Sequence, residues 1–298
     1  MQLGEAEADD LPDTDSRAAR YFRHATSGHW DPYAIDIEQD RETLVDLGRR
    51  PFTQFRATIA MFGAGEEAVV DDLLPLATAL EADDDQRFVA SHLYEEAKHA
   101  AFFDRYWTDV INPVEETRGL EPTDPTADCW FPDAYVEIFD RTETAMEKLL
   151  EADTPENRAA AYAHYHLTIE GVFAQVGFRA VRETFGPETD GPTVHGLTEG
   201  FEHIRRDEGR HVGFGLAKLE ALLASGAVDR ERIEDVVSTL APLIDDIAGR
   251  MGWKRLPGPS GEELVTDAAE QRAKRLAQLT AATAREPESD SADRNGGR

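Results

Sequence analysis

The segment YEEAKHAAFF, residues 94–103, places a glutamate and a histidine three residues apart, as Glu96 and His99. The same spacing recurs later in the chain as Glu208 and His211. Residues three apart on a helix lie on one face, so each pair can bind a single metal ion. Four-helix bundles that hold two metals in their core combine two such pairs with one glutamate from each of two further helices. The two pairs therefore predict such a bundle, provided that two further glutamates are present.

Two glutamates in apolar helical stretches complete the set, Glu66 in FGAGEEAVV and Glu170 in HLTIEGVF. Each stands ahead of one Glu-x-x-His pair, so the arrangement occurs twice along the chain. Carboxylates are hard ligands that bridge two cations, and imidazole binds iron and manganese well. The set contains no thiolate, which argues against structural zinc. Four carboxylates and two imidazoles predict a di-iron or iron/manganese site, and with it oxygen chemistry.

The position of Glu66 on its helix favours it over its neighbour Glu67 as the ligand. Glu66 lies four residues from Phe62 and three from Val69, within an apolar stripe. An unpaired carboxylate in such a stripe is costly, so a metal partner is expected there. Glu67 falls toward Asp71 and the solvent face of the helix.

Other acidic residues beside the two pairs have different expected roles. Glu95 lies four residues before His99 and could share its face, but the three-residue spacing of the bundle motif favours Glu96. Asp207 is not expected to be a ligand, for the same reason. It is better placed to accept a hydrogen bond from the outer nitrogen of a metal-bound histidine. The remaining histidines match no such spacing, and we expect them to be surface or satisfied core residues.

The spacing of apolar residues predicts helices and no strand of useful length. We expect an all-α fold, with a ferritin-like four-helix bundle core and additional helices. Breakers and caps place the expected helices at about 53–82, 84–111, 132–152, from 155 to near 186, from near 192 through the second pair, 229–250 and 261–284. Residues 112–130 are expected to form a loop.

The chain is expected to have three parts. Residues 1–16 form an acidic, flexible N-terminus, because the segment is acidic and lacks apolar periodicity. Residues 17–284 form the helical domain with the dinuclear metal site. Residues 285–298 form a polar tail that we expect to be disordered.

The charge balance is extreme for a chain of 298 residues. It has 60 acidic residues against 31 basic ones, a formal net charge of −29. Charge of one sign repels itself, and low salt screens that repulsion poorly, so the composition indicates a halophilic protein. It also argues against nucleic acid or an anionic membrane surface as a partner, since both need basic residues.

The cellular location is expected to be cytoplasmic. Cys129 is the only cysteine, so the chain has no internal disulfide. The first residues, MQLGEAEADDLPDTDS, contain no apolar stretch of the kind found in signal peptides. No run of about 18 apolar residues occurs, so no membrane span is expected.

Five motifs together resemble one protein family. They are WDPYAIDIEQD, GEEAV, EEAKHAAFF, YHLTIEG and RRDEGRH. Their combination is similar to the ligand-binding oxidases that look like ribonucleotide reductase small subunits, and the resemblance covers roughly residues 20–250. It implies a ferritin-like homodimeric oxidoreductase with one manganese and one iron ion per chain, or two iron ions as the alternative.

The resemblance also implies roles for the six ligand candidates and for a bound molecule. The manganese site carries over to Glu66, Glu96 and His99. The iron site carries over to the three remaining candidates, Glu170, Glu208 and His211. A long-chain fatty acid, or a similar apolar ligand, is implied to reach the metals through a hydrophobic tunnel.

A covalent cross-link is the most specific implication of the resemblance. In the family, the oxygen-activating cofactor joins a valine three residues after the first ligand to a tyrosine five residues before the third. The matching residues here are Val69 and Tyr165. Five residues correspond to about 140° away from the face of Glu170 on a regular α-helix, so we expect a local π-helical bulge near Tyr165.

Two other functions are weighed against the oxidase. A ribonucleotide reductase small subunit would carry its radical tyrosine four residues after His99, where this chain has Phe103, and would dock through an apolar tail that residues 285–298 do not resemble. A ferritin-like metal-binding protein without turnover is the third possibility, which Val69 and Tyr165 disfavour.

Trp30 resembles the tryptophan that connects the metals to the surface in small subunits. The matching path would run from Trp30 through Asp207 to His99. A core tryptophan that anchors the N-terminal segment is the equal alternative. The sequence names neither the physiological substrate nor the electron donor.

Overall fold

The computed structural model describes residues 16–253 and 255–283 of the chain. Every regular element over these residues is helical, which confirms the expected all-α fold. The elements are α1 (Arg17–Ser27), α2 (Asp40–Asp46), α3 (Arg49–Ala79), α4 (Asp83–Tyr106), η2 (Trp107–Ile111), α5 (Asn112–Thr117), η3 (Asp128–Trp130), α6 (Asp133–Glu151), α7 (Pro155–Tyr162), η4 (Ala163–Ala174), α8 (Gln175–Phe185), α9 (His195–Ala224), α10 (Arg230–Met251) and α11 (Gly261–Thr283).

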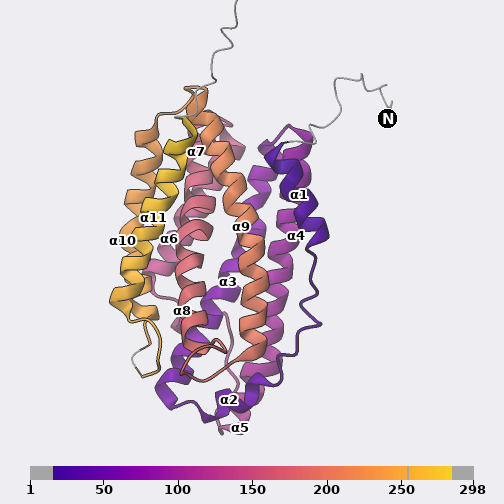
Figure 1. Cartoon of the computed structure of the whole chain (residues 1–298), viewed down its shortest axis with the longest axis vertical. Helices are drawn as coiled ribbons and strands as arrows, with labels where there is room; N and C mark the ends of the chain where they lie inside the picture. The colour runs from indigo at the N-terminus through magenta and orange to yellow at the C-terminus, as the bar shows by residue number, and fades with distance from the viewer. Residues whose placement is uncertain (1–15, 254, 284–298) are drawn as a thin grey trace, which may run out of the picture.

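Four long helices form the ferritin-like core of the molecule. They are α3, α4, α9 and the continuous helix made by α7, η4 and α8. Figure 1 shows them running along the long axis, with α1 beside α4 on one flank and α10 and α11 on the other. The short helices α2 and α5 lie together at one end. The additional helices thus enclose the core on its flanks and at this end.

Apolar clusters fill the core above and below its midpoint. One contains Phe55, Ile59 and Phe102, and another contains Val69 and Phe88. Because α3 and α4 pass from the first cluster to the second, the polar residues between these positions lie enclosed by apolar layers. The metal-ligand candidates occupy this stretch.

Several helix boundaries differ from the sequence expectations. The helix expected to end at Ile111 continues through η2 into α5, so residues 112–117 of the expected loop are helical, with Pro113 in the first turn of α5. The sequence reasoning also missed two helices near the N-terminus. One is α1, which Ser16 caps by accepting a hydrogen bond from the Ala19 amide at 3.0 Å, and the other is α2.

Some expectations fall outside the described residues. The expected N-terminal segment, apart from Ser16, and the expected tail at 285–298 are among them, so the three-part division of the chain stays a prediction. Among the helices that the structure describes, none has the length and apolar character needed to cross a membrane.

Candidate metal centre

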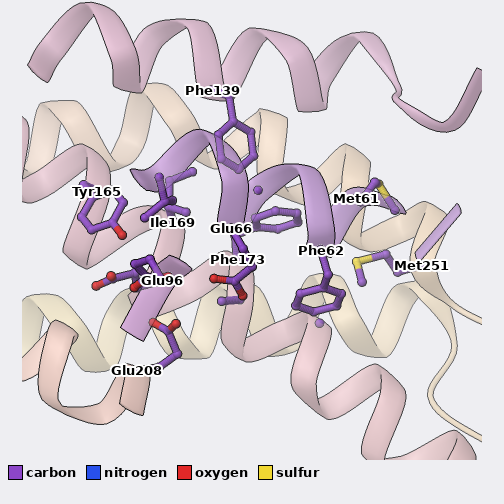
Figure 2. Close-up of a pocket in the computed structure, with 15 residues that line it drawn as sticks. Met61, Phe62, Glu66, Glu96, Phe139, Tyr165, Ile169, Phe173, Glu208 and Met251 are labelled. Atoms are coloured by element: carbon purple, nitrogen blue, oxygen red, sulfur yellow. The ribbon is translucent and has the colours of Figure 1, made fainter. Parts of the chain in front are cut away.

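The structure brings all six predicted ligand residues together in the middle of the bundle. α3 supplies one glutamate, α4 and α9 each supply a Glu-x-x-His pair, and the π-helical segment η4 supplies the last glutamate. All six side chains are buried, at 0–8% exposure. Figure 2 shows the carboxylates of Glu66, Glu96 and Glu208 directed toward one another from three different helices.

Glu96 lies between two groups of possible ligands. One group contains Glu66, Glu96, His99 and Glu208, and its candidate ligand atoms lie within 4.8 Å of one another. His99 Nδ1 is 3.3 Å from Glu66 Oε2 and 3.3 Å from Glu96 Oε2. The other Glu96 oxygen, Oε1, faces His211. Glu96 is therefore placed to bridge two cations.

The second group lies on the other side of Glu96. His211 Nδ1 is 2.9 Å from Glu96 Oε1 and 3.6 Å from both Glu170 Oε1 and Glu208 Oε2. This group also contains His92, which the sequence analysis counted among the histidines expected to be surface or satisfied core residues. The missed signal was its spacing, since His92 lies four residues before Glu96 on the same face of α4.

Asp207 lies at the outer nitrogen of His99, where the sequence placed it. His99 Nε2 is 3.2 Å from Asp207 Oδ2, which also accepts hydrogen bonds from Trp30 Nε1 at 2.8 Å and Lys98 Nζ at 3.0 Å. Burial alone would raise the pKa of Asp207, but the hydrogen bond to His99 and the charges of His99 and Lys98 hold it well below its ordinary value. The ionised Asp207 can hold the His99 ring with Nδ1 toward the metal position.

Glu95 performs the equivalent contact for the second histidine. His211 Nε2 is 2.9 Å from Glu95 Oε2, and Arg210 pairs with both Glu95 and Asp207. The sequence reasoning weighed Glu95 only as a competing ligand and missed this role. Its position beside Glu96 on α4 turns it toward α9 and away from the carboxylate cluster.

Burial and the contacts between neighbouring charged groups together set the pKa values in the cluster. Burial raises the pKa of Glu66 well above its ordinary value, and it raises that of Glu208 to about 7, with help from the charges of Glu96 and Glu170. For His99, burial lowers the pKa, but the charge of Glu66 and the contact with Asp207 outweigh it and hold the pKa well above normal. Without cations, the cluster thus retains protons that isolated side chains would release.

The donor set fits two divalent cations. Glu170 Oε2 and Glu208 Oε2 are buried oxygens without a hydrogen-bond partner among the described residues. Such orphaned acceptors are rare in folded proteins and indicate an ion that completes the site. Two divalent cations carry four positive charges, which would balance the four clustered carboxylates.

An apolar pocket adjoins the carboxylates. Its empty space amounts to about 510 Å³, a figure that includes the open mouth. In Figure 2, Glu96 and Glu208 lie toward one end, Met61 and Met251 lie at the other, and Glu66 lies between them. Apart from its four glutamates and the Tyr165 hydroxyl, the pocket has an apolar lining.

The two cross-link candidates both border this pocket. Val69 is 4% exposed and Tyr165 is fully buried. The expected local π-helix is confirmed, because η4 is π-helical from Ala163 to Ala174 and carries both Tyr165 and Glu170. In a π-helix, the backbone hydrogen bonds join residues five apart, so Tyr165 and Glu170 lie on the same side of the helix.

The fold is that of several solved R2-like ligand-binding oxidases. A tyrosine-to-phenylalanine variant with an aerobically reconstituted Mn/Fe cofactor is 24% identical, with a TM-score of 0.74 over 95% of this chain and 98% of that chain. A structure described as a long soak with the same cofactor is 22% identical, with a TM-score of 0.75 over 93% and 98% of the two chains. A glutamate-to-aspartate variant is 23% identical, with a TM-score of 0.74 over 95% and 98%.

At these identities the likeness establishes the fold, and it agrees with the group that the sequence motifs resemble. No protein-family model matches the chain.

Proposed function

We propose that this protein is a metal-dependent, oxygen-activating oxidase of the R2-like ligand-binding type, with one manganese and one iron ion per chain. A pair of iron ions is the alternative. The observation that carries the proposal is the convergence of four buried carboxylates and two imidazoles at the centre of the bundle. Oxygen and nitrogen donors in this ratio suit iron and manganese.

The residues have distinct tasks in this proposal. Glu66 and His99 hold one metal, Glu170 and His211 hold the other, and Glu96 and Glu208 lie between the two positions. Bound metals of this kind activate oxygen and supply the oxidising power to remove hydrogen from a C–H bond.

The surrounding residues control orientation and water. Asp207 and Glu95 fix the two histidine rings through their outer nitrogens. Apolar layers above and below the cluster, including Phe88 and Phe103, exclude water from it. Exclusion of water protects reactive species from side reactions.

The ligand in this proposal is a long-chain fatty acid or a similar apolar molecule with a polar head. The pocket beside Glu66 supports this, because metals held by the glutamates would receive the head and the lining of Phe62, Met61 and Met251 would receive the chain. Flexible methionines suit chains of variable shape.

The cross-link is part of the same proposal. A C–O bond forms between Val69 and the Tyr165 phenol oxygen, while one C–H bond and one O–H bond break. The two electrons and two protons released pass to oxygen, the oxidant of the reaction. Burial raises the pKa of Tyr165 well above its ordinary value, so the phenol stays protonated until it is oxidised.

A metal-binding comparison on one helix tests the proposal. We expect the wild-type protein, assembled with iron and manganese, to hold about two metals per chain, and Glu66→Ala to lose at least one. Glu67→Ala is the matched control, because Glu67 is the exposed neighbour of Glu66 on α3 and should keep the full complement. Binding of zinc alone, or equal metal content in both variants, would reject the metal centre.

The alternatives and the assembly state are outcomes of related measurements. A reductase small subunit would support nucleotide reduction with a large subunit, and a metal store would take up iron without oxidising its own side chains. The reductase small subunit is not favoured, because Phe103 stands where such a subunit would carry its radical tyrosine. The proposed homodimer is checked by light scattering of the metal-loaded protein.

A further inference from the structure

His92 is fully buried on α4 and faces the carboxylates of the metal centre. Its Nε2 is 2.9 Å from Glu170 Oε1 and 2.9 Å from Glu96 Oε1. Both of these residues are ligands in the proposed function. His92 is therefore a third imidazole at the cluster, beyond the two that the Glu-x-x-His pairs supply.

The nitrogens of His92 and His211 converge on one oxygen. The two rings stack with centroids 3.5 Å apart and planes 24° apart. His92 Nε2 and His211 Nδ1 each lie 2.9 Å from Glu96 Oε1. Together with Glu170, these donor atoms lie within 4.8 Å of one another, close enough for a single ion to bind them all. Two imidazoles aimed at one carboxylate oxygen compete for it, whereas a cation between them would use both nitrogens.

A nearby histidine shows what an ordinary core histidine looks like in this protein. His166 is also fully buried, but its ring packs among the rings of Tyr162, Tyr165, Phe214 and His92 itself, and neither ring nitrogen has a hydrogen-bond partner among the described residues. His92 differs because its Nε2 meets two carboxylates. Burial next to acids that bind a metal indicates a ligand more than a packing residue.

We propose that His92 is a seventh ligand, which binds through Nε2 the metal held by Glu170 and His211. The inference rests on the proposed metal centre and deepens it. The two metal positions then differ, since one has His99 as its only imidazole and the other has two. A second nitrogen donor strengthens binding of iron(II) relative to manganese(II), because affinity rises in that order and imidazole accentuates it.

His92 should be the weakest of the three imidazole ligands. The outer nitrogens of His99 and His211 meet Asp207 and Glu95, respectively. No described residue accepts a hydrogen bond from His92 Nδ1. An acceptor at the outer nitrogen raises the basicity of a ligand histidine and fixes its ring, and His92 lacks this support.

Titration of the metal-free full chain with iron(II) alone, under anaerobic conditions, tests the inference. We expect two binding steps in the wild-type protein. His92→Gln and His92→Ala should weaken one step at least ten-fold and leave the other unchanged, while His166→Gln, the matched change at the buried histidine that packs against His92 but meets no carboxylate, should leave both unchanged. Thermal melts of each metal-free variant check that it is folded, and His92→Gln keeps a polar group where alanine would leave a cavity.

A crystal structure of the iron(II)-loaded wild-type protein gives an independent reading. We expect a metal about 2 Å from His92 Nε2, the length of a metal–imidazole bond. Two outcomes would overturn the seventh ligand and leave the oxidase proposal intact. In the first, the crystal structure shows a metal bound by His211 while His92 Nε2 is still hydrogen-bonded to Glu170. In the second, His92→Gln binds iron(II) as tightly as wild type although His211→Ala loses a metal. Absence of metal from the wild-type protein would overturn both the seventh ligand and the oxidase proposal.

Discussion

Tyr165 lies at the metal centre with its hydroxyl buried and without a hydrogen-bond partner among the described residues. If it is joined to Val69, aerobic assembly with iron and manganese should lower the intact mass by about two hydrogens, and anaerobic assembly should not. Tyr165→Phe should abolish the change and keep the metals. Tyr162→Phe is the matched control, because Tyr162 is a buried tyrosine one turn away whose hydroxyl also lacks a partner.

Peptide mapping tests directly whether the bond between Val69 and Tyr165 has formed. Aerobically assembled wild-type protein should give one joined peptide containing Val69 and Tyr165. Recovery of two fully separate peptides would show that the cross-linking chemistry is absent, even if the metals are bound.

Asp72 on α3 provides a pH-dependent test away from the metals. Burial raises its pKa to about 7, with further contributions from the charges of Glu143, Asp71 and Glu147. A carboxyl with a raised pKa keeps its proton in the folded protein, so its ionisation costs stability as pH rises from about 4 to 7. Asp72→Asn should therefore gain stability over wild type across this window, by at most about 1.4 kcal/mol per pH unit. Denaturant unfolding at several pH values measures the difference.

Asp71→Asn is the control for this test. Asp71 is the exposed neighbour, and its substitution should change stability far less steeply with pH. A stability difference between Asp72→Asn and wild type that is constant from pH 4 to 7 would contradict the raised pKa.

At the residue scale, sequence reasoning found the positions defined by spacing and missed those defined by packing. The Glu-x-x-His pairs could be recognised in the sequence because residues three apart share a helix face. His92 lies four residues before Glu96 and therefore shares its helix face, but a single histidine at that spacing does not by itself indicate a ligand. The contact of Glu95 with His211 depends on how α4 and α9 are rotated against each other, and one sequence does not give that angle.

Among the elements, η4 is the one that shapes the site. It is π-helical over Ala163–Ala174, and the Thr168 hydroxyl donates to the Ala163 carbonyl, five residues earlier, at 2.7 Å. The offset between Tyr165 and Glu170 predicted a local bulge, whereas the structure has a π-helix of 12 residues. The long helices themselves were predictable from apolar periodicity. The position of the helix end near Pro113 and the presence of α1 were not, because both depend on local backbone geometry.

Gly171 in η4 allows a test of how this segment positions Glu170. A Cβ at Gly171 would lie 2.8 Å from the His166 carbonyl oxygen and 3.2 Å from Arg275 Nε. Gly171→Ala should therefore destabilise the protein by about 1–3 kcal/mol, the usual cost of overpacking, and lower its metal content as Glu170 shifts. Chemical denaturation and metal analysis measure the two effects.

Gly209 is the matched control, because it follows Glu208 as Gly171 follows Glu170. A Cβ at Gly209 meets nothing within 4 Å, so Gly209→Ala should stabilise α9 by roughly 0.5–1 kcal/mol and keep the metals. Equal metal content in the two variants would show that η4 does not need its close packing to hold Glu170.

For the whole molecule, the net charge of −29 is the dominant physical property. Self-repulsion at low ionic strength destabilises the compact state, and added salt screens it. Thermal melts in rising potassium chloride should therefore show a steep increase in Tm from low to moderate salt. Each kcal/mol of relieved repulsion raises Tm by roughly 2–4 °C for a domain of this size class.

Sucrose at matched osmolality is the control, because it lacks the screening ions. A larger effect of the salt than of the sugar would support charge screening, and a flat or falling Tm from low to molar salt would contradict the halophilic reading. The fold class at this scale followed from the sequence, since the order of single glutamates and pairs already defined a four-helix bundle.

Anomalous diffraction at the manganese and iron absorption edges, from crystals of protein assembled with both metals, tests the central claim most directly. The account predicts two peaks within the cluster formed by Glu66, Glu96, Glu170 and Glu208, with both elements present. No anomalous peak at this cluster, or a single zinc ion in its place, would contradict it.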